Sequence, residues 1–165
     1  MELFMNKIVS KTNALRLAEN AGLDFEAFEY DTGDGCIDGR SVAKKIGRSP
    51  DEVFKTLVAQ APGREYFVFI VPSAGELDLK KAARAVSRKS IELIALKELL
   101  PLTGYVHGGC SPLGMKKLFP TFIDETALLF DRIWVSGGKV GLNIAVVPEA
   151  LAKVVNAGFA DIVKQ

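Results

Sequence analysis

A lysine inside an apolar run is the residue of this sequence best suited to chemistry. Lys55 lies in residues 53–58 (VFKTLV), a run that predicts the start of a strand. Side chains alternate along a strand, so Lys55 and Thr56 are expected on opposite faces. The ammonium group either reaches solvent at the strand end or lines a pocket, where it binds an anion or polarises a carbonyl. Both interpretations fit the spacing.

A glycine-rich segment, residues 104–114 (GYVHGGCSPLG), is the second candidate. Gly108 and Gly109 can adopt backbone angles that are closed to other residues. Their N–H groups could then converge on one oxygen, as in an oxyanion hole or an anion-binding nest. The spacing is equally typical of a tight loop with a rigid Ser-Pro turn at Ser111.

The sequence contains few residues that could serve in nucleophilic catalysis or bind a metal. His107 is the one histidine, and Cys36 and Cys110 are the two cysteines. A nucleophile–base relay needs a third, orienting group, and a structural zinc site needs four ligands where the chain has three Cys and His in total. We therefore expect no metal and no cofactor. His107 and Cys110 are expected to be a strand-end histidine and a small buried cysteine.

Nucleotide-binding motifs are also incomplete. Residues 109–116 (GCSPLGMK) nearly match a P-loop, but Met115 separates the second glycine from the lysine. Lys117 then stands where the motif requires a hydroxyl. No G-x-G-x-x-G opens a helix after a strand, so a dinucleotide-binding fold is not expected.

Composition and charge are typical of a soluble globular protein. The 165 residues are 48% hydrophobic and 25% charged, with 21 basic and 20 acidic side chains, and they predict a single domain over residues 1–165. This balance gives no support to strong sequence-blind binding of nucleic acid, although the basic residues 80–89 could contact a phosphate backbone. No apolar run is long enough for a membrane span, and residues 1–10 lack the apolar core of a signal peptide. We expect a cytoplasmic protein.

These residues must be positioned by helices and strands. The pattern of helices and strands in the sequence predicts a mixed α/β (α+β) domain with a strongly curved, barrel-like β-sheet surrounded by helices. Helices are expected at 12–22, 41–46, a short turn after Ser49, 78–86 and 148–158. Strands are expected at 25–30, 56–61, 65–71, 90–94, 103–107, 121–123, 132–136 and 140–147. Pro62-Gly63 and Gly137-Gly138 predict hairpin turns.

Five ordered motifs together resemble the YbaK/aminoacyl-tRNA synthetase-associated family. They are residues 54–57 (FKTL), 75–81 (GELDLKK), 103–106 (TGYV), 108–114 (GGCSPLG) and 136–139 (SGGK). Residues 159–162 (FADI) add a family-like C-terminus, and the match runs from about Thr12 to the end. The order and spacing of the motifs make the resemblance specific, which no single motif would.

The resemblance implies release of an amino acid from tRNA. The YbaK branch is a trans-editing enzyme that acts on mischarged Cys-tRNA(Pro), with prolyl-tRNA synthetase as the implied partner, while sister branches remove alanine or other small residues. The family is similar to substrate-assisted catalysts, in which the cysteine thiol of the substrate attacks its own ester carbonyl and gives a thiolactone. Two alternatives remain, an alanyl-tRNA(Pro) deacylase and a non-catalytic module that binds tRNA ends or nucleotides.

The resemblance also implies roles for residues. Lys55 would anchor the substrate and Gly109 would face the ester carbonyl. The implied substrate-binding residues are Tyr30, Thr56, Gly108, Ser111, Ser136 and Asn143. Asn143 stands where relatives often carry Asp, so one acidic contact becomes neutral. Residues 31–39 do not align with the segment that forms a pocket wall in relatives.

Overall fold

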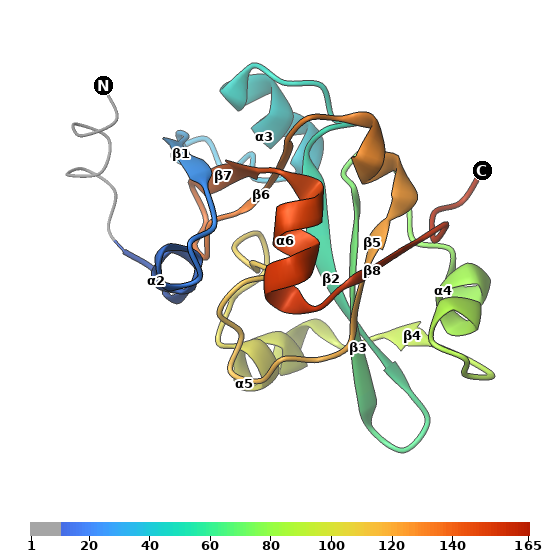
Figure 1. The fold of residues 1–165 in the computed structure, drawn as a ribbon. Helices are drawn as coiled ribbons and strands as arrows, with labels where there is room; N and C mark the ends of the chain where they lie inside the picture. Colours follow the sequence, from blue (N-terminus) through green and yellow to red (C-terminus); the bar gives the residue numbers. More distant parts are fainter. Residues whose placement is uncertain (1–10) are drawn as a thin grey trace.

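The computed structural model describes residues 11–165, so residues 1–10 of the predicted single domain lie outside the described residues. In this part of the chain, short helices surround two β-sheets (Figure 1). One sheet has the strand order β1-β7-β6, and the other has the order β4-β2-β3-β5-β8. The strands are β1 (Phe25–Glu29), β2 (Phe54–Ala61), β3 (Glu65–Pro72), β4 (Glu92–Leu93), β5 (Thr121–Asp124), β6 (Ile133–Ser136), β7 (Leu142–Val146) and β8 (Gly158–Ala160).

The helices are short and most carry a clear start signal. They are α2 (Asn13–Asn20), α3 (Gly39–Ile46), α4 (Leu79–Ala85), α5 (Leu99–Thr103) and α6 (Pro148–Val155), with the 3₁₀ turns η1 (Leu96–Glu98) and η2 (Glu125–Leu129). The predicted caps are confirmed, because the side chains of Thr12 and Asp78 accept backbone N–H bonds at the starts of α2 and α4. Within residues 11–165, no helix is long and apolar enough to cross a bilayer.

The mixed α/β class predicted from the sequence is confirmed, whereas the barrel-like closure is not. β2 and β3 run antiparallel, while β3, β5 and β8 run parallel, and each sheet ends in edge strands. The sheets meet at an isolated bridge between Val53 and Trp134, and the Trp134 N–H donates to the Glu52 carbonyl at 2.9 Å. The three-stranded sheet thus borders the start of β2, and neither sheet closes on itself.

Both hairpins predicted from the sequence are present. β2 and β3 pair along their whole length around a turn at Gly63, whose φ is 89°. β6 and β7 also pair antiparallel, which places Ser136 opposite Asn143. Opposed residues of an antiparallel pair project from the same face. The hairpin therefore places these two polar side chains next to each other on one face of the sheet.

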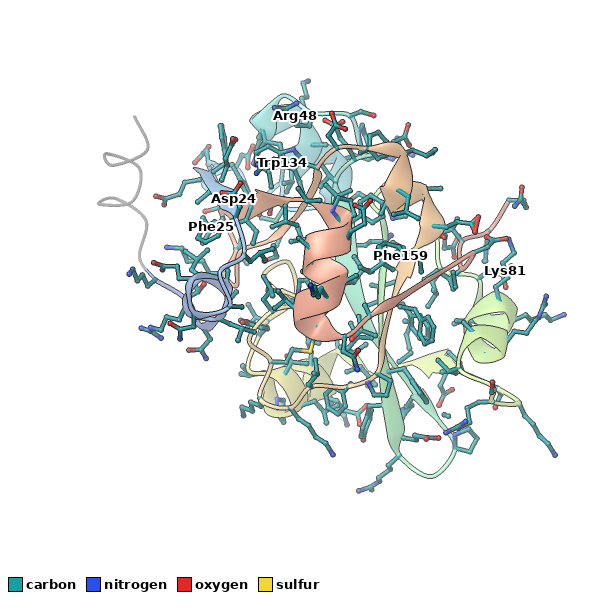
Figure 2. All side chains as sticks on the ribbon, in the orientation of Figure 1. Asp24, Phe25, Arg48, Lys81, Trp134 and Phe159 are labelled. Carbon is teal, nitrogen blue, oxygen red and sulfur yellow. The ribbon has the colours of Figure 1, made fainter. Side chains whose placement is uncertain are left out.

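Three groups of buried side chains hold the elements together. The largest joins residues of both sheets with α2 and α6, which enter it through Leu15 and Leu151. A second joins the five-stranded sheet to α4. A third attaches α3 to β6 and β7, where Ile46 packs with Trp134. Arg48 lies over the Trp134 ring, with its guanidinium carbon 5.5 Å from the ring centroid (Figure 2). The end of α3 is thereby fixed relative to the three-stranded sheet.

Two element predictions are wrong, and the terminating residue of one helix is misplaced. Residues 50–52 form a turn before β2, where a capping-box pattern predicts helix. The predicted strand at 103–107 is absent, because α5 runs to Thr103 and ends at Gly104, whose φ is 86°. α6 ends at Asn156 in the left-handed conformation rather than at Gly158, which begins β8. In each case the residues form or adjoin a turn or a helix cap that the local pattern did not predict.

Candidate active site

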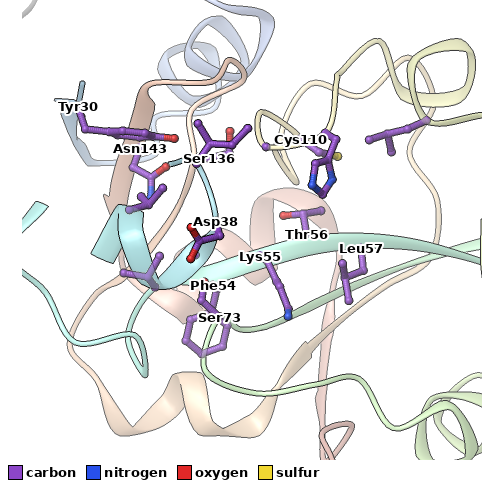
Figure 3. Close-up of a pocket in the computed structure, with 17 residues that line it drawn as sticks. Tyr30, Asp38, Phe54, Lys55, Thr56, Leu57, Ser73, Cys110, Ser136 and Asn143 are labelled. Atoms are coloured by element: carbon purple, nitrogen blue, oxygen red, sulfur yellow. The ribbon is translucent and has the colours of Figure 1, made fainter. Parts of the chain in front are cut away.

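A cavity of about 270 Å³, called the β2 pocket here, lies beside the first half of β2 (Figure 3). β4 pairs only with Ala59 and Gln60, so among residues 11–165 this half of the β2 edge has no strand partner. The volume is slightly below that of typical small-molecule sites, which span about 300–1,000 Å³. The lining residues are Tyr30, Ile37, Asp38, Gly39, Val42, Val53, Phe54, Lys55, Thr56, Leu57, Ser73, Leu99, His107, Gly108, Cys110, Ser136 and Asn143.

The β2 side of the pocket presents polar groups that have no partner in the described part of the chain. Lys55 and Thr56 both line the cavity, and Figure 3 shows them leaving β2 in opposite directions. The Thr56 hydroxyl oxygen is buried and has no hydrogen-bond partner among the described residues. Within residues 11–165, no carboxylate forms an ion pair with the Lys55 ammonium. Of the two interpretations open from the sequence, the structure places Lys55 in the pocket wall.

The backbone of β2 adds to this side of the pocket. The Val58 carbonyl accepts from the Ile94 N–H at 3.2 Å, so Val58 directs its backbone groups away from β3. In an antiparallel strand, residues two apart direct their N–H and C=O groups to the same side. Thr56 therefore turns its backbone N–H and C=O toward the open edge as well. One residue can thus offer a hydroxyl and an amide to a bound molecule.

Three of the predicted substrate-binding residues form the opposite wall. Ser136 ends β6, Asn143 lies opposite it on β7, and Tyr30 follows β1. The Tyr30 N–H donates to the Gly141 carbonyl at 2.9 Å, which ties the end of β1 to the β6–β7 turn. Asn143 is buried, and the Ser136 hydroxyl accepts from the Gly138 N–H at 3.1 Å. The structure thus brings together residues that are more than a hundred positions apart.

The glycine segment contributes less than the sequence suggests. Gly108 lines the pocket with a φ of 84°, but Gly109 and Ser111 are outside the lining. The Gly109 N–H donates to the Val106 carbonyl at 2.9 Å, and the fully buried Ser111 hydroxyl accepts from the Leu113 N–H at 3.2 Å. The expectation that Gly109 faces the ester carbonyl with a free amide is therefore not supported. Its N–H closes a turn instead.

Cys110 is unsuited to act as a nucleophile although it lines the pocket. Burial raises the pKa of the Cys110 thiol to about 12, so the group stays protonated at neutral pH. Cys110 belongs to the core shared by the two sheets, as a small buried cysteine should, and both cysteines are free. His107 is exposed in a turn rather than at a strand end. Among the described residues, no cluster of three or more Cys, His, Asp and Glu could hold a metal ion.

One charged lining residue was missed by the sequence reasoning. The sequence predicts this helix only from residue 41, yet Asp38 is the N-cap of α3 and borders the pocket. Hydrogen bonds from the Ser41 hydroxyl, and more weakly from the Ser41 N–H, lower the pKa of the Asp38 carboxyl below its usual range. The available signal was the Asp three residues before Ser41, because Asp is among the preferred N-caps.

The loop before Asp38 is held by a single lysine. The Lys45 ammonium donates to the carbonyls of Asp31 and Cys36 at 2.7 and 2.8 Å and to the Asp34 carboxylate at 2.8 Å. The ion pair with Asp34 raises the pKa of Lys45 and lowers that of Asp34. This clamp gives residues 31–38 a defined path that ends at the pocket-lining Ile37 and Asp38.

A family model described as the aminoacyl-tRNA editing domain matches residues 38–154. The chain belongs to this family. The matched range contains every lining residue of the β2 pocket except Tyr30 and Ile37. The resemblance identified from the sequence motifs is thereby confirmed, and the pocket belongs almost entirely to the editing domain.

Individual relatives agree with the assignment. A protein of Enterococcus faecalis (strain ATCC 700802 / V583), named "Putative Cys-tRNA(Pro)/Cys-tRNA(Cys) deacylase EbsC", is 40% identical over 156 residues, covering 94% of this chain and 95% of that protein. A crystal structure of "a putative trans-editing enzyme for prolyl tRNA synthetase" has a TM-score of 0.83 at 24% identity, covering 95% of this chain and 100% of that one. A hypothetical protein gives 0.85 at 19% identity, covering 93% and 100%. These two structures establish the fold alone.

Proposed function

We propose that this protein is an aminoacyl-tRNA deacylase that releases cysteine from wrongly charged Cys-tRNA(Pro). The observation that carries the proposal is the β2 pocket of an editing domain. Among residues 11–165, its lysine has no ion pair and its Thr56 hydroxyl has no hydrogen-bond partner. Its one cysteine is held in the thiol form. The 40% identical relative, named as a Cys-tRNA deacylase, supports cysteine as the amino acid.

The reaction uses the nucleophile of the substrate. The sulfur of the cysteinyl group attacks its own carbonyl carbon and forms a carbon–sulfur bond. The ester bond to the terminal ribose then breaks, and the ribose oxygen takes the proton that the thiol gives up. The first products are a cysteine thiolactone and a free tRNA end, and water later opens the thiolactone to cysteine. Such an intramolecular attack gains its rate from positioning.

The pocket residues would position the ester and stabilise the charge that develops on its carbonyl oxygen. Lys55 anchors the substrate and supplies the cation. Thr56, whose side chain leaves β2 in the opposite direction from Lys55, offers its hydroxyl and its open-edge amide as hydrogen-bond donors to the ester. Gly108 lies across the pocket, and Ser136 and Asn143 bound the space for the small side chain. Gly109 acts by shaping the loop rather than as a donor.

A partner would supply much of the tRNA selectivity. The chain has a net charge of +1, which favours weak intrinsic binding to a polyanion. Weak binding suits an enzyme that receives mischarged tRNA from a synthetase, and prolyl-tRNA synthetase is the partner that we propose. The whole chain would then act as a single editing domain in the cytoplasm, where charged tRNA is found.

A deacylation assay tests the proposal. Purified protein is mixed with tRNA(Pro) charged with cysteine, alanine, serine or S-methylcysteine, and the remaining ester is measured over time. Release of cysteine that is much faster than release of S-methylcysteine is expected, because a thioether cannot form the thiolactone. Fast release of alanine would contradict the thiol-assisted reaction, since alanine has no thiol, and alanine would then replace cysteine as the proposed substrate. No release from any of the four would leave the pocket as a binding site only.

A further inference from the structure

The β2 pocket contains one acidic and one strongly basic side chain. Among its described lining residues, Asp38 is the only carboxylate, and Lys55 is the only lysine or arginine. The two do not form an ion pair with each other. Figure 3 shows the Asp38 carboxylate between β2 and the wall that carries Ser136 and Asn143. A molecule that fills the pocket therefore meets a negative group on the α3 side.

Asp38 is an exposed residue at the rim of the pocket, and Ser41 holds its carboxylate in place. One carboxylate oxygen accepts from the Ser41 hydroxyl at 2.6 Å, and the other accepts from the Ser41 N–H at 3.2 Å. The next residue, Gly39, packs so closely on Ser73 that an added Cβ would lie 2.3 Å from the Ser73 hydroxyl oxygen. An ionised carboxylate has about four acceptor positions. Two hydrogen bonds from Ser41 therefore leave Asp38 able to accept from a ligand.

The neighbouring carboxylates are already used or are outside the pocket. Asp34 pairs with Lys45, and the Asp31 carboxylate accepts from the Gly33 N–H at 3.0 Å. Neither residue lines the cavity. On the opposite wall, Asn143 provides a neutral amide. Asp38 is thus the one described group that can offer negative charge to a molecule in the pocket.

We infer that the Asp38 carboxylate binds the α-ammonium group of the aminoacyl ester. This inference rests on the proposed function, since the ammonium is the one cation of a cysteinyl ester. The consequence is a specificity rule that goes beyond the amino-acid side chain. The enzyme should favour esters with a free α-amine and should discriminate against esters in which a neutral group replaces it. Peptidyl-tRNA, whose amine is acylated, would be spared for that reason.

The test compares two substrates that differ only at the α-position. One is Cys-tRNA(Pro), and the other is tRNA(Pro) charged with 2-hydroxy-3-mercaptopropionate, which keeps the thiol but replaces the ammonium by a hydroxyl. Hydrogen bonds to charged groups contribute enough to give the wild type about a tenfold or greater preference in kcat/KM for the amine. In Asp38→Asn this preference should fall to about one- to twofold through loss on the amine substrate alone.

The variant is chosen so that the fold is retained. Asn is about as good an N-cap as Asp, so α3 should begin normally in Asp38→Asn. Asp51→Asn is the matched control, because Asp51 is an exposed carboxylate between α3 and β2 that does not line the pocket. The control should keep the wild-type preference. Equal use of both substrates by the wild type, or an equal loss on both in Asp38→Asn, would overturn the inference.

A binding measurement separates the inference from the proposed function. The probes are 3′-amino-3′-deoxyadenosine acylated with cysteine or with 2-hydroxy-3-mercaptopropionate, whose amide bonds resist cleavage. Suppose that the wild-type protein has no deacylase activity but binds the amine probe at least tenfold more tightly than the hydroxyl probe, and that Asp38→Asn loses this preference. This result would refute the proposed function and leave the inference standing. Equal binding of both probes, or binding of neither, would refute the inference.

Discussion

The two sides of the β2 pocket differ in whether their polar groups are already satisfied. On the β2 side, the Thr56 hydroxyl has no partner among the described residues, and its backbone faces an edge without a strand. On the glycine-loop side, the amide of Gly109 and the hydroxyl of Ser111 are hydrogen-bonded within the loop. A buried polar group without a partner costs about 1–3 kcal/mol of folding free energy. Such a cost is tolerated most readily where a ligand can provide the missing bond.

The difference separates residues that do chemistry from residues that shape the pocket. Groups with free hydrogen-bonding capacity can respond to charge that develops on a substrate, whereas groups that are already bonded hold their neighbours in place. The β2 side should therefore be sensitive in activity and tolerant in stability. The glycine-loop side should show the opposite behaviour.

The largest effect is expected at Lys55. Lys55→Met keeps most of the apolar stem and removes the cation, so deacylation of Cys-tRNA(Pro) should fall by about 10²–10³-fold, the loss typical of one preorganised stabilising group. The folded protein should survive, because no ion pair among the described residues involves Lys55. Single-turnover rates and a thermal melt give both quantities. Lys153→Met, on the exposed face of α6, is the matched control.

Unchanged turnover in Lys55→Met would show that the lysine serves only as a solvent-facing strand residue. A parallel loss in Lys153→Met would instead indicate a general effect of charge on tRNA binding. The comparison between the sides of the pocket survives only if the first variant is impaired and the second is not.

Thr56 should show opposite effects on activity and stability. Thr56→Val is nearly isosteric and removes a buried hydroxyl that has no partner within the described structure. Activity should fall by about 10–10²-fold through loss of one donor, while stability is unchanged or raised, because the unsatisfied group costs about 1–3 kcal/mol. Thr56→Ser retains the hydroxyl and should keep most of the activity. A destabilised Thr56→Val with normal rates would place the hydroxyl in the fold rather than in the site.

Gly109 tests the other side. Gly109→Ala would place a Cβ 2.8 Å from the Val140 N and 2.9 Å from the Lys139 carbonyl carbon. Backbone atoms cannot move aside easily, so we expect a loss of about 1–3 kcal/mol in unfolding free energy. Activity per folded molecule should drop only a few-fold, since the Gly109 N–H is used by Val106. A stable variant that is nearly inactive would indicate that the Gly109 amide takes part in catalysis.

Local sequence signals predicted most of the elements that build the pocket. The Gly63 turn identified the β2–β3 hairpin, and the Gly137-Gly138 pair identified the β6–β7 hairpin. These signals work because turn residues and alternation are properties of short segments. Lys55 was found for the same reason, since a charged residue in an apolar strand is conspicuous within six residues of sequence.

The remaining features depend on contacts between distant segments. Asp38 was missed because α3 was expected to begin at Ser41, so its N-cap was assigned to a loop. The satisfied amide of Gly109 could not be foreseen, because it depends on the path that the loop takes from Val106. A barrel was expected since the number of strands predicts strong curvature, but closure depends on edge pairing that no short motif specifies.

The smallest effect on activity is expected from removing the enzyme's own nucleophile candidates. A variant with Cys36→Ala, Cys110→Ala and His107→Ala should still deacylate Cys-tRNA(Pro) within a few-fold of the wild type. Its rate should keep the same dependence on pH, rising with ionisation of the substrate thiol, whose unperturbed pKa is about 8.5. Rates measured from pH ~6 to ~9 check this. A large loss in the folded variant, or a shifted pH profile, would return attention to Cys110.

The raised pKa of Cys110 also predicts that the folded protein becomes less stable as pH rises above neutrality. Cys110→Ala should remove part of this loss of stability. The folded protein holds the Cys110 proton up to about pH 12, while the unfolded chain releases it near the ordinary pKa of 9.0. Between these values the folded state binds more protons, so stability falls as pH rises. Burial raises the pKa of Tyr105 to about 12 as well, which acts with the same sign. Denaturant midpoints should therefore fall from pH ~8 to ~10.5 in both proteins, but less steeply after Cys110→Ala. Identical slopes would mean that the thiol is more accessible to solvent than its position in the core implies, and a nucleophilic role for Cys110 would again be open.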